Sequence, residues 1–358
     1  MVARSLRRAS FAQLRDFLSG HFAAAGELLE CRKFEGGQSN PTYLLVCREG
    51  KFVLRAKPGG RLLKSAHAID REFRVLRALM ASAVPVPTVH LYCDDDSVIG
   101  SAFYLMDHVD GRSFCNPELP EVSEPQRSAM YASMNKTLAA LSQVDIHAVG
   151  LGNFGRPEGF FERQVRRWTD QYRAAETERR EHMESLIEWL PTHLPGEHGQ
   201  AGLMHGDFRL DNMIFDNDGR VAAVLDWELS TIGHPHADLA YQCAQWRLPT
   251  GAMRGLAGLD RQALGIPSED EYVESFCRRT GLATIPDWDF LLALSLFRLA
   301  SICQGVYRRG LDGNASSPLA LEFGARTAVI AEYAVGILAS GSCQSAAPQI
   351  SGVNIAVV

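Results

Sequence analysis

The sequence lacks the features that define several large classes of protein. Its eight cysteines are scattered, with no CxxC pair and no Cys/His cluster, which argues against a disulfide framework or a zinc site. The net charge is −6, whereas nucleic-acid-binding proteins usually carry a surplus of basic residues. No uncharged apolar run reaches about 18 residues, the length that would predict a membrane span. We therefore expect a cytoplasmic protein with free, buried thiols that binds neither nucleic acid nor membrane.

The pattern of elements changes along the chain. A length of 358 residues exceeds the usual size of one core, so two lobes with a binding cleft are expected. Residues 42–46 and 51–54 are strand-like and flank a hairpin signal, and residues 88–92 and 102–106 predict two further strands. Helical periodicity dominates from residue 124 onward. This order predicts an α+β fold with a small antiparallel sheet followed by a mainly helical part.

We place the domain boundary where the last predicted strand ends. The predicted parts are an N-terminal lobe at 1–107, a helical lobe at 108–340 and a flexible tail at 341–358.

The N-terminal part contains several candidates for binding an anion. A Gly-Gly-polar turn between strands lets backbone N–H groups approach a phosphate, and it consists of Gly36, Gly37, Gln38 and Ser39. Arg55 and Lys57 are two residues apart, so they share one face of a strand. Glu72 lies beside the apolar face of a helix predicted over 65–80 and can pair with either cation.

One stretch holds three polar residues at a spacing that suits phosphoryl transfer. The segment HGDFRLDN at 205–212 contains Asp207 and Asn212, and Asp226 follows at the end of an apolar run. One carboxylate can receive a hydroxyl proton, while the other carboxylate and the amide suit Mg²⁺ on nucleotide phosphates.

This arrangement resembles the aminoglycoside phosphotransferase and choline kinase family, whose members are relatives of protein kinases. The segment HGDFRLDN is similar to the family's catalytic loop, and LDWE at 225–228 is similar to its counterpart of the kinase DFG motif. The resemblance implies a protein-kinase-like two-lobe fold with ATP and Mg²⁺ as cofactors. It implies that Asp207 is the catalytic base, that Asn212 and Asp226 are metal ligands, and that Arg209 stabilises transferring phosphate.

The resemblance also assigns the nucleotide contacts and one departure from the family pattern. Residues 36–39 resemble the flap over the phosphates, Arg55 stands where kinases have a lysine, and Glu72 resembles the helix glutamate that pairs with it. Whether Arg55 or Lys57 contacts phosphate stays open. The segment that resembles the hinge for adenine consists of Met106, Asp107, His108 and Val109. In GHPHADLA at 233–240, His234 replaces the usual Asp, and Asp238 is predicted to cap its helix and brace the catalytic loop.

The acceptor is predicted to be a small molecule with a hydroxyl group. Residues 241–358 contain ten acidic and nine basic residues, a balance that does not favour a polycation. Arg298, Arg308 and Arg309 could suit an anion, and the arginines of residues 163–167 could either face an anionic substrate or form a solvated helix face. Residues 52–59, 65–74 and 164–172 resemble the branch associated with acyl-CoA dehydrogenases, which implies a hydroxyacyl-CoA acceptor and a functional link to such a dehydrogenase.

Three alternatives stay open. They are an aminoglycoside phosphotransferase, a nucleotide-binding pseudokinase and a protein kinase. The intact Asp207, Asn212 and Asp226 argue against a pseudokinase. The chain lacks HRD, DFG and APE segments, which argues against a protein kinase.

Overall fold

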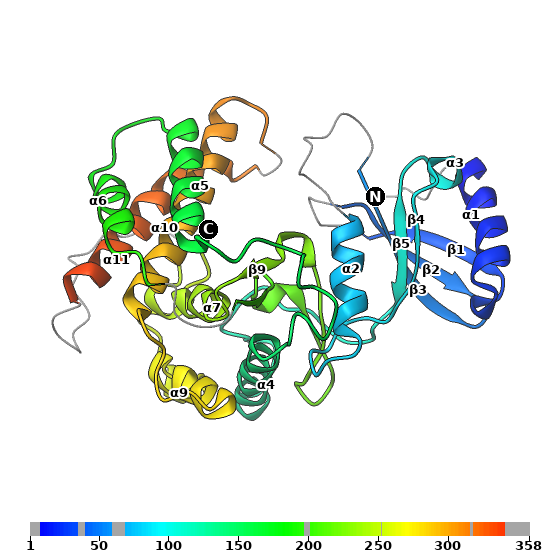
Figure 1. Cartoon of the computed structure of the whole chain (residues 1–358), viewed down its shortest axis with the longest axis horizontal. Coiled ribbons are helices and arrows are strands. Elements are labelled where there is room, and N and C mark those ends of the chain that lie inside the picture. The colour runs from blue at the N-terminus through cyan, green and yellow to red at the C-terminus, as the bar shows by residue number, and fades with distance from the viewer. Residues whose placement is uncertain are drawn as a thin grey trace. The chain divides into compact units, whose positions relative to one another are not determined.

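A computed structural model describes residues 8–34, 40–58, 69–196, 201–251, 253–315 and 318–340. The chain divides into two compact units (Figure 1). The first comprises the chain up to Ser113 together with residues 145–152 and 211–230, and the second comprises the remainder. The sequence-based division had assigned 211–230 to the helical part. The predicted glycine turn at 36–39 and the predicted tail at 341–358 lie outside the described residues.

The first unit is built on a five-stranded antiparallel sheet with the order β1-β2-β3-β5-β4. Its strands are β1 (Leu28–Lys33), β2 (Thr42–Cys47), β3 (Gly50–Ala56), β4 (Val89–Cys93) and β5 (Phe103–Asp107). The predicted hairpin joins β2 to β3, with Cys47 opposite Gly50. A short helix, α3 (Asp96–Ile99), lies between β4 and β5.

Two helices cover opposite faces of this sheet, α1 (Arg8–His21) and α2 (Ile69–Leu79) (Figure 1). Successive strand residues point to opposite faces, so Leu54 and Arg55 of β3 have different surroundings. Leu54 is fully buried in a cluster with Leu14 and Leu18 of α1. Burial of each such leucine stabilises the unit by roughly 1.5–3 kcal/mol. Arg55 consequently faces α2, where Glu72 lies.

A two-stranded ribbon completes the first unit. It consists of β7 (Met213–Phe215) and β8 (Val221–Val224), followed by the 3₁₀ turn η4 (Trp227–Leu229). The Asp216 carboxylate accepts the backbone N–H groups of Asp218 and Arg220, which closes the tight turn between the strands. The N–H of Val224 donates to the carbonyl of Pro85 at 2.8 Å, so the ribbon is hydrogen-bonded to the segment after α2.

The second unit is mainly helical, as predicted. Its helices are α4 (Glu124–Ser142), α5 (Phe160–Ala175), α6 (Glu181–Trp189), α7 (Ala237–Arg247), α8 (Arg261–Leu264), α9 (Glu269–Thr280), α10 (Trp288–Leu311) and α11 (Phe323–Ser340). A small ribbon pairs β6 (Gly202–Met204) with β9 (Thr231–Gly233). The helix α10 packs against α5, α7 and α11 and forms the centre of this unit.

Helix α10 is also long and apolar enough to cross a membrane by length and composition. However, 72% of its most apolar window is buried inside the protein, which is typical of a core helix. The cysteines of the described ranges are all free, and Cys115 is exposed, whereas the others are buried as predicted.

Candidate active site

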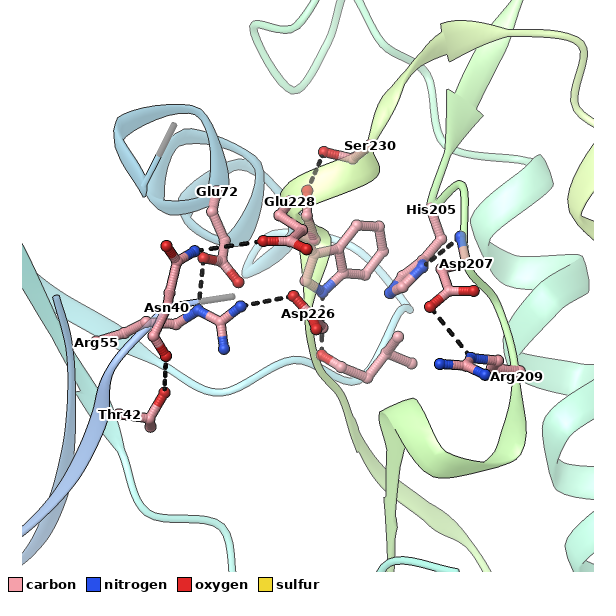
Figure 2. A network of polar contacts seen from close by, with 12 residues as sticks. Asn40, Thr42, Arg55, Glu72, His205, Asp207, Arg209, Asp226, Glu228 and Ser230 are labelled. Atoms are coloured by element: carbon pink, nitrogen blue, oxygen red, sulfur yellow. Dashed lines mark hydrogen bonds and ion pairs between the residues drawn. The ribbon is translucent and has the colours of Figure 1, made fainter. Parts of the chain in front are cut away.

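The predicted site residues that the structure describes fall into two groups, one in each unit. In the first unit, Arg55 of β3 donates from Nε to Glu72 at 2.8 Å and from Nη2 to Asp226 at 2.5 Å (Figure 2). The three side chains come from β3, α2 and the end of β8. The predicted pairing of Glu72 with a strand cation is therefore confirmed, and Arg55 is the partner.

The charges of this group are only partly balanced. Glu72 is 1% exposed, and its burial, together with the fields of Asp226 and Glu228, raises the pKa of Glu72 to about 7 despite the opposing effect of Arg55. Burial alone would lower the pKa of Arg55, but the carboxylates of Glu72, Asp226 and Glu228 together raise it. Three acidic side chains thus surround one guanidinium. This surplus of acidic groups favours a bound cation.

Asp226 occupies a strained backbone position. Its φ of 63° and ψ of 60° are left-handed, a conformation that costs most residues about 1–2 kcal/mol and that aspartate tolerates better than most. The turn ends β8 and directs the carboxylate towards Arg55. It is held by Trp227, whose buried indole Nε1 donates to the carbonyl of Val224 at 3.0 Å, and by Ser230, whose hydroxyl donates to the carbonyl of Trp227 at 2.6 Å.

Asn212 and Asp226 lie at the same end of the β7–β8 ribbon. The N–H of Leu225 donates to the carbonyl of Asn212 at 2.8 Å, so the two predicted metal ligands are held on adjacent strand ends. Both offer the oxygen atoms that Mg²⁺ prefers, and Mg²⁺ is usually held by one or two protein carboxylates together with phosphate oxygens and water. Across the described ranges, no group of three or more His, Cys, Asp or Glu side chains is placed to hold a metal ion by itself.

The remaining N-terminal candidates differ in the ion pairs and hydrogen bonds that they form. Lys57 is exposed just beyond the end of β3 and makes no ion pair within the described residues. In the predicted hinge, the N–H of Asp107 donates to the carbonyl of Thr88 and the N–H of His108 donates to that of Lys51. Both of these backbone donors are therefore already used, and Met106 is paired with Val53 within the sheet.

In the second unit, the loop that follows β6 carries Asp207. The loop turns at Gly206, whose φ of 81° favours glycine, and the N–H of Asp207 donates to Nδ1 of buried His205 at 3.1 Å. Asp238, near the start of α7, accepts the N–H groups of His205 at 2.6 Å and Gly206 at 2.9 Å. The predicted bracing of this loop by Asp238 is confirmed. The predicted capping is not made by this side chain, because His236 is the N-cap residue of α7.

Both oxygens of Asp207 accept hydrogen bonds. Nε of Arg209 donates to Oδ2 at 3.1 Å (Figure 2), and the hydroxyl of Tyr241 donates to Oδ1 at 2.9 Å. Burial would raise the pKa of Asp207, but Arg209, Tyr241, His205 and Arg298 together outweigh it and lower that pKa. Asp207 is therefore ionised at neutral pH and is held in one orientation.

Arg298 of α10 supports the same loop. Its Nη2 donates to the carbonyl of Gly206 at 2.5 Å, and its guanidinium carbon lies 4.6 Å from the ring centre of Tyr241. Of the three α10 arginines predicted to suit an anion, Arg308 pairs with Asp312 and Arg309 is exposed. Only Arg298 lies beside Asp207.

Sequence reasoning missed Tyr241 as a site residue. Its position three residues after Asp238 was a usable signal, because side chains at i and i+3 of a helix lie on one face. Arg298 carried no comparable local signal, since it approaches the loop from a helix about ninety positions later in the chain.

His234, which replaces the usual aspartate of the family pattern, lies among aromatic rings. His234 and His236 lie with ring centres 5.0 Å apart, beside Phe161 and Phe276. Burial, and secondarily His236, lower the pKa of His234 to about 4, and burial lowers the pKa of His236. Both rings are therefore neutral at neutral pH.

Comparison with known proteins identifies the family. The family model described as "Phosphotransferase enzyme family" matches residues 30–291. The chain belongs to this family. It is 47% identical to mouse acyl-CoA dehydrogenase family member 10 over 324 residues, which cover 90% of this chain and 30% of that protein. This phosphotransferase therefore spans less than a third of the length of that curated relative.

Solved structures agree with the family assignment. A crystal structure from Ralstonia eutropha, provisionally named an aminoglycoside phosphotransferase, is 45% identical, with a TM-score of 0.85 over 92% of this chain and 98% of that one. Spectinomycin phosphotransferase, solved with ADP and spectinomycin, has a TM-score of 0.61 at 12% identity, over 91% of this chain and 98% of that one, and shows the fold alone. The predicted two-lobe α+β fold, the class of enzyme and the resemblance to the acyl-CoA dehydrogenase-associated branch are confirmed.

Proposed function

We propose that this phosphotransferase is an ATP- and Mg²⁺-dependent small-molecule kinase that phosphorylates a hydroxyl group of a hydroxyacyl-CoA or a related hydroxy-acid derivative. The observation that carries the proposal is the state of Asp207, which is ionised, bonded at both oxygens and braced through Asp238. A carboxylate of this kind suits the orientation of an acceptor hydroxyl and receipt of its proton as the P–O bond forms.

The acidic surplus around Arg55 supports the metal assignment. Asn212 and Asp226 would hold Mg²⁺, which would supply charge neutralisation on the nucleotide phosphates. Arg55 would contribute a fixed cation near those phosphates, because it is already held by two carboxylates. The exposed Lys57 has no such support, so we assign the phosphate contact to Arg55. Adenine would use Val109 of the hinge, since the N–H groups of Asp107 and His108 are engaged and Met106 is paired with Val53 within the sheet.

Arg209 has a distinct role in this proposal. It bonds Oδ2 of Asp207 in the structure, while Tyr241 holds Oδ1. If the Arg209 side chain moved to contact the γ-phosphate, Oδ2 of Asp207 would become available for the acceptor hydroxyl. The guanidinium would then stabilise charge in the transition state.

The acceptor class rests on charge and on the relatives. The neighbour from Ralstonia eutropha is provisionally named for aminoglycosides, whereas the mouse relative is named for acyl-CoA dehydrogenation. The balanced charge of residues 241–358 does not favour a polycation. The name of the mouse relative supports the second class and a functional link to an acyl-CoA dehydrogenase. We also propose a cytoplasmic location, which cell fractionation would test.

The test is a transfer assay with purified protein and ATP, with and without Mg²⁺. Acceptors would be 3- and 4-hydroxyacyl-CoAs, the free hydroxy acids, choline and kanamycin, with ADP release and product mass as readouts. We expect a hydroxyacyl-CoA or hydroxy acid to gain one phosphoryl group, and Asp207→Asn to lower kcat at least 100-fold. Asp170→Asn on the exposed face of α5 is the matched control. Phosphorylation of kanamycin alone would refute the acceptor class, and full activity of Asp207→Asn would refute the catalytic assignment.

A further inference from the structure

Helices α5 and α10 bring two arginines to one tryptophan in the second unit. The guanidinium carbon of Arg167 lies 5.2 Å from the ring centre of Trp168, and that of Arg298 lies 5.3 Å from it. Trp168 itself is buried, at 7% exposure, so the indole is a fixed support for both cations.

This pair of cations forms no direct ion pair with an acidic side chain. In the part of the chain that the structure describes, neither Arg167 nor Arg298 forms an ion pair with a carboxylate within 4 Å. The Nε atom of Arg298 is buried without a hydrogen-bond partner. Desolvation, and secondarily the like charge of Arg298, lower the pKa of Arg167, as expected for two cations that share one aromatic ring.

Arg298 also acts on the loop of Asp207, where it helps to lower the pKa of Asp207. An anion bound beside Arg167 would reduce the repulsion between Arg167 and Arg298. A polycationic ligand would increase the repulsion, since like charges brought together at a binding surface oppose association.

The position of the pair connects it to the reacting group. Arg298 contacts the carbonyl of Gly206 and the ring of Tyr241, and the hydroxyl of Tyr241 is bonded to Asp207. Trp168 therefore lies one side chain away from the residues that orient the proposed base. Arg298 thus links the ring of Trp168 to the loop that carries Asp207.

The neighbouring arginines of α5 do not share these properties. Arg163 donates to the backbone carbonyls of Glu158 and Arg156, so its hydrogen-bonding groups are engaged. Arg166 and Arg167 are both exposed, and Arg166 lines a 240 Å³ hollow with Ile187 and Pro191. Arg166 therefore provides a matched control of the same charge on the same helix.

We propose that Arg167 and Arg298, supported by Trp168, form an acceptor subsite that binds an anionic group, either a carboxylate or a phosphate, of the molecule whose hydroxyl is phosphorylated. The identity of the ligand as acceptor rests on the proposed function. The subsite itself is a statement about anion binding and can be tested without catalysis.

The experiment is calorimetric binding to the full chain in the absence of ATP, at low ionic strength. The probes are 3-hydroxybutyrate for the carboxylate, 3-hydroxybutyryl-CoA for the phosphates, methyl 3-hydroxybutyrate as the neutral analogue, and kanamycin as the polycation. We expect at least one of the two anions to bind at least tenfold more tightly than the neutral ester and the polycation. Which anion binds identifies the source of the charge.

The variants assign the binding to the pair. Arg167→Gln should weaken anion binding about tenfold, whereas Arg166→Gln should change it less than twofold. Arg167→Lys should recover part of the loss, and thermal unfolding would verify that each variant is folded. Equal binding of the neutral ester, binding of none of the probes, or equal effects of Arg166→Gln and Arg167→Gln would overturn the subsite. Anion binding that depends on Arg167 without any phosphoryl transfer would instead uphold the subsite and refute the proposed function.

Discussion

Replacement of Arg55 by methionine should destabilise the first unit strongly and in a pH-dependent way. Methionine has a similar length but no charge, so Glu72, at 1% exposure, would lose its only ion-pair partner in the described residues. Removal of one member of a buried ion pair typically costs 3–5 kcal/mol, because the other charge stays buried without compensation. We expect a loss of about 3 kcal/mol, since protonation of Glu72 relieves part of this cost.

The pH dependence follows from the pKa of Glu72. In the wild type this pKa is already raised from 4.5 to about 7 by burial, and loss of Arg55 raises it further. The folded state then binds a proton that the unfolded state releases near pH 4.5, so stability decreases as pH rises between these two values. Arg55→Met should therefore lose more stability at pH 8 than at pH 6.

The assay should report on the first unit alone. Trp227 is the single tryptophan of that unit and is 1% exposed, so its ¹⁹F resonance in protein labelled with 5-fluorotryptophan would follow local unfolding in urea. The double variant Arg55→Met/Glu72→Gln removes both charges and should regain at least 1.5 kcal/mol relative to Arg55→Met, by the logic of a double-mutant cycle. A double variant no more stable than the single variant, or a loss independent of pH, would refute this account of the pair.

Three further predictions concern the second unit. Tyr241→Phe should lower kcat/KM about tenfold, because a hydrogen bond to a charged group contributes roughly 1.5–3 kcal/mol. It should also move the acid limb of the pH–rate profile to higher pH, because that bond lowers the pKa of Asp207. An unmoved limb would contradict the role of Tyr241. Asp238→Asn presents an amide donor where two backbone N–H groups need acceptors. It should therefore lower the free energy of unfolding by about 1–3 kcal/mol and reduce kcat. A melting temperature equal to that of the wild type would contradict the expected loss of stability. The pKa of His234 is about 4 in the folded protein and returns to about 6.5 in the unfolded chain, so the ring is neutral when folded. It therefore contributes stability that is complete above pH 6.5 and is lost towards pH 4, at most about 3 kcal/mol. Urea unfolding of His234→Asn between pH 7 and pH 5 should show a weaker pH dependence than that of the wild type.

The outcome of sequence reasoning depended on whether a residue's partners are local. The β2–β3 hairpin and the helical part from residue 124 onward follow from periodicity and turn residues, and the structure confirms both. Arg55 and Lys57 could not be distinguished, because alternation gives both the same strand face. The choice depends on Glu72 and Asp226, which come from other parts of the chain.

The loop of Asp207 shows the same limit. HGDFRLDN identified Asp207, Arg209 and Asn212 from residue types and family spacing. The partners that determine the pKa and orientation of Asp207 include Tyr241 and Arg298, which reach it through helices α7 and α10. Packing of distant helices is not encoded in local spacing, so a motif predicts which atoms react but not what holds them.

The charges gathered in the two units differ in sign, and this contrast bears on the acceptor. Around Arg55, three acidic side chains face one cation, which suits a divalent metal ion. In the second unit, Arg167 and Arg298 share the ring of Trp168, which suits an anion. A kinase whose acceptor is a polycation would need carboxylates beside this pair, because like charges brought together oppose binding. The charge of the acceptor is therefore determined by residues outside the catalytic motif, and substitution of Arg167 should change acceptor preference without changing the affinity for nucleotide.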